Sequence, residues 1–159
     1  RELARKSYKP APIQFAGDTD IYQPLERELK IARSVLEVLS ETRHPVTLIT
    51  KSALVLRDLD LLAPMAAQNL ARVAISLTTL DRRLARAMEP RASAPHRRLE
   101  AIRELAAAGV PVTVMTAPII PALNDSELER LLEAAAHAGA VSAGWVMLRL
   151  PLEISALFQ

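Results

Sequence analysis

Short aliphatic runs alternate along this chain with longer stretches in which apolar residues recur every three or four positions. The short runs predict buried strands, and the longer stretches predict amphipathic helices. Because strands that alternate with helices favour right-handed βαβ units, the sequence predicts an α/β domain with a parallel sheet of about five strands. The expected strands cover residues 13–16, 46–50, 73–77, 111–116 and 145–150.

The strand starts recur at intervals of about 30 residues, which is the spacing of βα units in a (β/α) barrel. About five such units cannot close an eight-stranded barrel. The pattern therefore leaves two architectures open, a curved partial barrel and a doubly wound sheet. In a barrel the polar residues that follow the strands share one edge, where active sites lie.

The first expected helix spans residues 24–41 and opens with Pro24, in a position that proline favours. Its charged residues, Glu26 among them, are expected to face solvent. Its apolar repeat predicts an inward row of residues, which are Leu25, Leu29, Ala32, Leu36 and Leu39.

Further signals mark the ends of later helices. Asp58 is expected to cap the second helix. Asn124 with Glu127 resembles a capping box ahead of the last helix. Gly109 and Gly139 stand where glycine commonly ends a helix.

Residues 81–93 are expected to form a long polar loop, the longest connection in the chain, ahead of a helix at 95–108. Long loops on a rigid scaffold are often functional. Glu89 and Arg91 lie in this loop, where an arginine fork can bind a carboxylate or phosphate unless the two residues only pair with each other.

Composition narrows the class of protein. Half of the 159 residues are hydrophobic and only 3% are aromatic, so a single domain with an aliphatic core is expected over residues 1–159. No apolar run reaches the roughly 18 residues of a membrane span, and the first residues do not resemble a signal peptide. Since the chain begins with Arg1, we expect an excised piece of a cytoplasmic protein.

Charge and cysteine content exclude further kinds of site. With 20 basic and 18 acidic residues, the pI near 9.3 reflects near balance, and no block pairs arginines with aromatics as in a nucleic-acid surface. The absence of cysteine excludes disulfides and thiolate metal sites within these residues. His44, His96 and His137 lack metal-ligand spacing and are expected at the surface or in loops.

The strand ends carry the candidate chemistry. Asp18 and Asp20, with Gln23 beside them, can bind an amine or a cation, and can equally well cap the next helix. Lys51 is the only lysine at a strand end. It can form a Schiff base if desolvation removes its charge, or act as a point charge for a carboxylate, although spacing alone favours a solvated loop lysine.

The third strand ends in hydroxyl groups. Ser76, Thr78 and Thr79 can hydrogen-bond a ribose or a carboxylate, but hydroxyl side chains are common in and after strands. These residues therefore indicate a polar strand end and do not by themselves define a ligand.

Four segments taken together resemble one family. They are GDTDIYQP, TKS followed by RDLDLL, VAISLTTLD, and EPR followed by RRLEAIRELAAAG. In this order, and over nearly the whole chain, the sequence resembles radical S-adenosylmethionine (SAM) enzymes. The similarity is to the subgroup that resembles spore photoproduct lyase and is labelled DNA repair photolyase.

The resemblance implies a (β/α)6 partial barrel, of which these residues would supply about five βα units. It also implies two cofactors, SAM and a [4Fe–4S] cluster held by a CxxxCxxC loop after the first strand. Electron transfer then cleaves SAM to a 5′-deoxyadenosyl radical, which abstracts hydrogen from substrate. Because this sequence has no cysteine and is expected to begin after that strand, the piece alone is expected to be inactive.

The family's motifs match the polar strand ends. The resemblance places GDTD near the amino group of SAM and segment 118–121 on the adenine side. It matches Lys51 and Ser52 to the following strand end of the family, and Ser76 to a hydroxyl near the ribose or carboxylate of SAM. It implies no metal ligand or substrate residue, and a nucleic-acid substrate rests on the resemblance alone. The implied cofactor-binding residues are Gly17, Asp18, Thr19, Asp20, Lys51, Ser52, Ser76, Arg91, Ile120 and Arg149.

Two other functions stay open at this point. One is a cluster-free lyase or aldolase with Lys51 as the Schiff-base nucleophile. The other is a binding domain without chemistry of its own. In any of these cases a sheet that lacks its first strand exposes edges at residues 13–16 and 145–149, which predicts a homodimer that pairs them.

Overall fold

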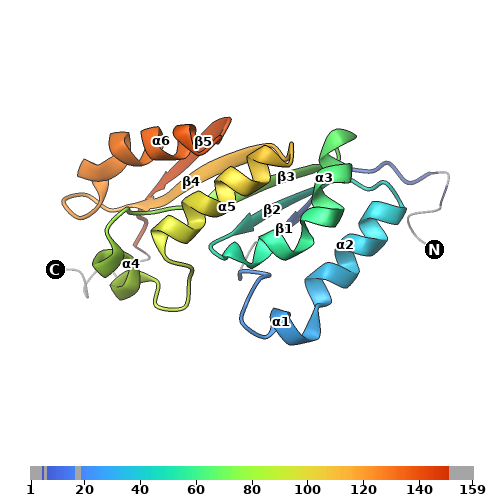
Figure 1. Ribbon diagram of the computed structural model, residues 1–159, viewed down its shortest axis with the longest axis horizontal. Helices are drawn as coiled ribbons and strands as arrows, with labels where there is room; N and C mark the ends of the chain where they lie inside the picture. The colour runs from blue at the N-terminus through green and yellow to red at the C-terminus, as the bar shows by residue number, and fades with distance from the viewer. Residues whose placement is uncertain (1–4, 6, 17–18, 151–159) are drawn as a thin grey trace.

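A five-stranded parallel sheet organises the molecule (Figure 1). The computed structural model describes residues 5, 7–16 and 19–150. The strands lie side by side in chain order, and each neighbouring pair is parallel. They are β1 (Ile13–Phe15), β2 (Val46–Thr50), β3 (Ala71–Ser76), β4 (Val112–Ile119) and β5 (Ser142–Met147).

Helices connect each strand to the next and lie over one face of the sheet, as α2, α3, α5 and α6 do in Figure 1. This follows from strand order, because right-handed crossovers between sequential strands all pass over the same face. A doubly wound sheet carries helices on both faces, so the partial barrel is the correct alternative. The helical segments are α1 (Glu26–Leu29), α2 (Ile31–Glu41), η2 (Ala53–Asp58), α3 (Leu59–Ala67), α4 (Arg82–Met88), α5 (Pro95–Ala107), η3 (Asp125–Glu127) and α6 (Leu128–His137).

The core lies between the sheet and these helices. Alternate residues of the central strands β2, β3 and β4 are buried on the helix side, and each large aliphatic side chain buried there contributes about 2 kcal/mol. The other face carries smaller or more polar residues that are partly exposed, such as Thr47, Ala74 and Thr113. The core includes Leu36, Val46, Leu48, Leu62, Val73, Ile75, Ile102, Leu105, Val112, Val114 and Leu131.

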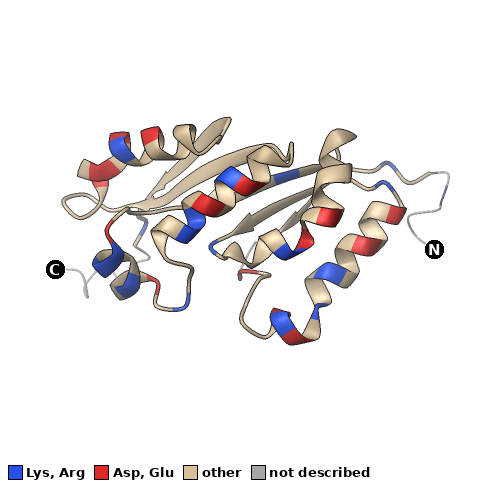
Figure 2. Ribbon diagram, viewed as in Figure 1, with Lys and Arg blue, Asp and Glu red and all other residues tan. Residues whose placement is uncertain are grey.

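Charged residues lie mostly on the helices. Figure 2 shows both signs interspersed along α2, α5 and α6, while the strands carry few charges. In the part of the chain that the structure describes, no helix is long and apolar enough to cross a membrane.

The second strand is confirmed, but other strand bounds differ from the expected ones. The first ends at Phe15, the third spans 71–76, and the fourth continues to Ile119. The fifth spans 142–147 rather than 145–150, because Ser142 pairs with Thr113 of β4. Small residues at the start of β5 hid its beginning, since they have little strand propensity.

The expected single helix over residues 24–41 is wrong. Lys30 has a left-handed φ of 51° and separates α1 from α2, so the apolar repeat changes phase. Leu25 and Leu29 are therefore 63% and 59% exposed, while Glu26 is 6% exposed. The buried face of α2 carries only the later members of the predicted row.

The loop predicted at residues 81–93 contains helix α4. Asp81 caps it by accepting hydrogen bonds from the backbone N–H groups of Arg83 and Leu84. With 7 residues, α4 spans about two turns, which is too short for a repeated apolar period to stand out in the sequence.

Two predicted helix caps, two glycines and one histidine can be compared with the structure. Neither Asp58 nor Asn124 makes a side-chain cap hydrogen bond, so both predicted caps are wrong. Gly109 and Gly139 do have left-handed φ values of 78° and 104°. His44 lies in the loop before β2, one of its two expected positions, but it is buried, and its ring contacts the Tyr8 hydroxyl and the carbonyl of Pro45.

Candidate functional site

The carboxyl ends of β1 to β4 surround a pocket of about 290 Å³. Thr50 pairs with Ile75, so the next residues, Lys51 and Ser76, lie level with each other at neighbouring strand ends. Ser76 in turn pairs with Met115 of β4. The pocket is lined by Ala16, Thr19, Asp20, Ile49, Thr50, Lys51, Ser76, Met115 and Ala117.

Asp20 joins the end of β1 to the end of β2. Its carboxylate accepts hydrogen bonds from the Thr50 hydroxyl at 2.7 and 2.9 Å and from the backbone N–H of Lys51 at 2.7 Å. It also accepts one from the backbone N–H of Tyr22 at 2.9 Å. These three donor groups use about three of the four acceptor sites of a carboxylate, so Asp20 fixes the position of Lys51 and keeps one site for a further donor.

A second pocket of about 570 Å³ shares Asp20 and Lys51 with the first. Its walls come from the loop after β1 and from the segment that joins α4 to α5. Gln23, Ser52 and Arg91 also line it. The two pockets together form a polar depression at the carboxyl edge of the sheet, with both signs of charge.

Lys51 forms an ion pair between these pockets. Its Nζ lies 2.6 Å from Glu89, whose second oxygen accepts from the buried guanidinium of Arg98 at 2.7 Å. Burial raises the pKa of Glu89, but Lys51 and Arg98 outweigh it and hold this pKa below its usual value. Because the Lys51 side chain is 43% exposed, it lacks the desolvation that a Schiff-base nucleophile needs.

A buried network supports the loop after β1. The Asp58 side chain is fully buried and accepts hydrogen bonds from Tyr22 at 3.0 Å and from Arg33 and Arg57. Burial and the neighbouring Asp58 carboxylate raise the pKa of Tyr22. Arg57 also bonds Glu26, which explains why that acid is buried.

The rim formed by β3 and β4 is held by two residues that the sequence assigned to a capping box. The Asn124 amide donates to the carbonyls of Thr78 and Pro118 and accepts from the Ile120 N–H. Glu127 accepts hydrogen bonds from Thr79 and Leu80. The Thr79 hydroxyl is therefore used to hold this rim together and does not line a strand-end pocket.

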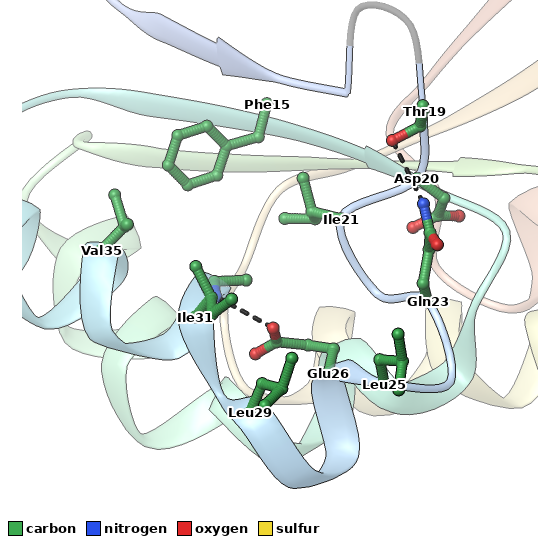
Figure 3. Close-up of a pocket in the computed structure, with 11 residues that line it drawn as sticks. Phe15, Thr19, Asp20, Ile21, Gln23, Leu25, Glu26, Leu29, Ile31 and Val35 are labelled. Carbon is green, nitrogen blue, oxygen red and sulfur yellow. Dashed lines mark hydrogen bonds between the residues drawn. The ribbon is translucent and has the colours of Figure 1, made fainter.

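A third pocket of about 400 Å³ lies beside β1 and is lined mainly by apolar residues. Figure 3 shows Phe15, Ile31 and Val35, from β1 and α2, around this space. Thr19 accepts a hydrogen bond from Gln23 at its margin. Its apolar lining does not suit a zwitterionic ligand, in contrast to the two pockets at the strand ends.

The structure thus brings together Thr19, Asp20, Lys51 and Ser76, and places Ser52 and Arg91 in the adjoining pocket. Ile120 and Arg149 line neither pocket: the N–H of Ile120 donates to Asn124 in the turn after β4, and Arg149 is exposed beyond β5. Gly17 and Asp18 lie outside the described residues.

The role of Arg98 was not predicted from the sequence. It precedes Ile102 and Leu105 at helical spacing, so the period of α5 already placed it on the buried face. The burial of Tyr22 was not predicted either, although a large aromatic side chain just after a strand is often buried.

Comparison with known proteins decides the family. The model of the radical SAM superfamily matches residues 1–135. The chain belongs to the radical SAM superfamily. Its strand-end pockets therefore lie in a radical SAM core.

Relatives of this radical SAM chain are longer. It is 36% identical over 141 residues to an uncharacterized protein of Mycobacterium tuberculosis, covering 87% of this chain and 42% of that protein. An uncharacterized protein of Methanocaldococcus jannaschii is 28% identical over 126 residues, covering 79% and 47%. The chain thus spans less than half the length of these relatives.

A solved structure supports the fold. The chain matches a mutant of spore photoproduct lyase with bound AdoMet and dinucleoside spore photoproduct, with a TM-score of 0.72 and 20% identity. The match covers 94% of this chain and 44% of that one. At this identity it confirms the partial barrel and does not transfer residue roles.

The radical SAM family implies an iron–sulfur cluster, but the donor set here does not fit one. The 159 residues contain no cysteine, and the described part of the chain has no group of three His, Cys, Asp or Glu residues able to hold a metal ion. Iron–sulfur clusters are held by thiolates. These residues therefore do not hold the cluster.

SAM, by contrast, suits the strand-end pockets. Its methionine end carries an ammonium and a carboxylate, and the pockets offer the Asp20 carboxylate and the Lys51 ammonium. Ser76 adds a hydroxyl on the same face of the sheet. The residues present thus match the chemistry of SAM, although not that of the cluster.

Proposed function

We propose that this chain is the SAM-binding core of a radical SAM enzyme whose cluster ligands lie outside these 159 residues. The observation that carries the proposal is the polar pocket at the ends of β1 to β4, in a chain matched by the family model. When SAM binds beside a reduced cluster, its reductive cleavage supplies a radical for hydrogen abstraction.

The roles of the pocket residues follow from their charges. Lys51 faces the carboxylate of SAM, Thr19 and Asp20 lie at its amino end, and Ser76 lies at the ribose. Asp20 also holds the Lys51 backbone through its carboxylate. Substitution of Lys51 is therefore expected to weaken SAM binding directly.

The test compares residues 1–159 with the full-length protein after anaerobic reconstitution with iron and sulfide. We expect no stoichiometric iron and no 5′-deoxyadenosine from residues 1–159, because they contain no thiolate. The full-length protein is expected to bind iron and release 5′-deoxyadenosine with dithionite. A full-length protein that binds iron yet never cleaves SAM would contradict the proposal.

We further propose a lyase acting on a photoproduct in nucleic acid. The solved neighbour binds a dinucleoside photoproduct. In this chain Arg27 and Arg91 line a pocket of about 200 Å³ that has no acidic residue in its lining and adjoins the second strand-end pocket. Such a pair of guanidinium groups suits a phosphodiester.

Salt dependence tests this substrate class. In the full-length protein, Arg27→Ala with Arg91→Ala is expected to reduce the salt slope of binding to irradiated DNA by about two, one for each lost phosphate contact. Glu100→Gln on α5, where the side chain is 40% exposed and pairs with Arg97, serves as the control. Wild-type protein that shows no affinity for irradiated DNA would exclude this substrate while leaving the SAM-binding core intact.

A further inference from the structure

The side chain of Lys51 is anchored at both ends. Its backbone N–H donates to Asp20 at 2.7 Å, and its carbonyl accepts from the N–H of Ser93 at 3.1 Å. Its ammonium ends 2.6 Å from Glu89, between the two strand-end pockets. A four-carbon lysine side chain is otherwise free to rotate, so this anchor defines where the charge lies.

Arg98 holds the Glu89 side chain in place. The Glu89 side chain is 9% exposed, and it accepts a hydrogen bond from Arg98, whose side chain is 2% exposed. The Arg98 guanidinium also donates to the carbonyl of Ser76 at 3.0 Å and to that of Ser93 at 2.6 Å. Arg98 thus ties Glu89 to the end of β3 and to the segment after α4.

The charges of these residues leave Lys51 available to an anion. Arg98 neutralises Glu89, so the buried pair adds no net charge beside the pockets. The ammonium has three donors, of which one serves Glu89. The group therefore carries one excess positive charge in a fixed place.

We propose that Glu89 and Arg98 are positioning residues, which hold the Lys51 ammonium where it meets the carboxylate of SAM. This inference rests on the proposed function. Neither residue touches SAM itself, and their effect passes through Lys51. Preorganisation of one long side chain is expected to change affinity by about tenfold.

A double-mutant cycle in the reconstituted full-length protein tests the inference, with dissociation constants measured by equilibrium dialysis. Lys51→Met is expected to weaken SAM binding by about 30-fold, as for one charge-assisted hydrogen bond. Glu89→Gln is expected to weaken it by about tenfold in the wild-type background. It is expected to have no further effect when Lys51 is already Met.

A second ligand separates positioning from folding. Decarboxylated SAM lacks the carboxylate, so Glu89→Gln is expected to leave its affinity unchanged. Glu100→Gln, which removes an exposed ion pair with Arg97 on the same helix, serves as the matched control and is expected to change neither affinity. If Glu89→Gln does not fold, Arg98→Lys replaces it, with the same expected pattern.

Three results would overturn the inference. Glu89→Gln could leave SAM affinity unchanged, weaken both ligands equally, or add its full loss to that of Lys51→Met. Wild-type protein that binds neither ligand would instead overturn the proposed function, so the two failures are distinguishable.

Discussion

The buried carboxylates of this domain each accept hydrogen bonds from more than one element. Asp58 joins α2 to the loop after β1, and Glu89 joins the ends of β2 and α5. Glu26 accepts from the first N–H groups of α2 and from Arg57. Their common effect is to fix loops whose other residues line the strand-end pockets.

At the residue scale we predict that Asp58 makes stability depend on acid pH. Burial raises the pKa of Asp58, but hydrogen bonds from Arg57, Arg33 and Tyr22 outweigh it and hold this pKa below its usual value. A depressed pKa contributes stability above the unfolded pKa of about 3.9, which is lost as the pH falls through the folded pKa. Stability should therefore fall below about pH 4.

Asp58→Asn tests this by urea unfolding at several pH values. We expect the variant to be about 2 kcal/mol less stable at pH 7, with the gap closing in acid as the wild-type carboxylate is protonated. Asp125→Asn, at an exposed position, should follow the wild type throughout. A gap that stays constant down to pH 2 would show that Asp58 does not carry this dependence.

At the scale of elements, helix ends give a sharper test. Gly109 and Gly139 both have left-handed φ, but a Cβ on Gly139 would lie 2.6 Å from the Cβ of Ala106, while one on Gly109 meets no atom within 4 Å. We predict that Gly109→Ala costs about 1 kcal/mol from backbone strain alone. Gly139→Ala should cost about 3 kcal/mol, because overpacking against α5 is added.

Denaturant unfolding of the two alanine variants measures both losses of stability and compares them. The extra loss at Gly139 combines the contact with Ala106 of α5 and a φ of 104°, which lies further from the left-handed minimum than the 78° of Gly109. Equal losses would mean that the two helices do not approach as closely as the structure shows.

The sequence predicted elements well where local patterns and packing agree. Residues 46–50 were predicted correctly because the run is β-branched and flanked by a proline. The break at Lys30 could not be predicted, since it depends on Glu26 accepting the N–H groups of α2 and on Arg57, far along the chain. β5 was misplaced because its bounds are set by pairing with β4.

The candidate site was predictable to a similar extent. Parallel strands bring their carboxyl ends together, so Asp20, Lys51 and Ser76 could be placed at one edge from the sequence. The partners that fix them could not, because Arg98 and Asp58 act through tertiary contacts. Arg149 lies beyond the end of β5 at Met147 and lines neither pocket, because the pairing with β4 places this strand earlier than expected.

At the scale of the whole molecule, the sheet ends in β1 and β5, so within the described residues both edges lack a neighbouring strand. Beside β1, Leu25, Leu29 and Ile31 are exposed, and on β5 Trp145 is 66% exposed. Open edges with apolar side chains favour pairing between chains. We therefore predict that residues 1–159 on their own form a dimer.

Light scattering across a concentration series measures this association. Trp145→Lys should weaken it, because a charge on an edge strand opposes pairing. Glu133→Lys, at an exposed position of α6, adds the same kind of charge away from the edge and should have no effect. A wild-type chain that stays monomeric at high concentration would exclude the dimer.

The central claim is that the carboxyl ends of β1 to β4 hold SAM. A crystal structure of the full-length protein grown with SAM tests it most directly. The account predicts difference density for SAM in the pocket between Asp20, Lys51 and Ser76, with its carboxylate within hydrogen-bond distance of the Lys51 ammonium. Density for SAM elsewhere, such as in the apolar pocket beside β1, would contradict it.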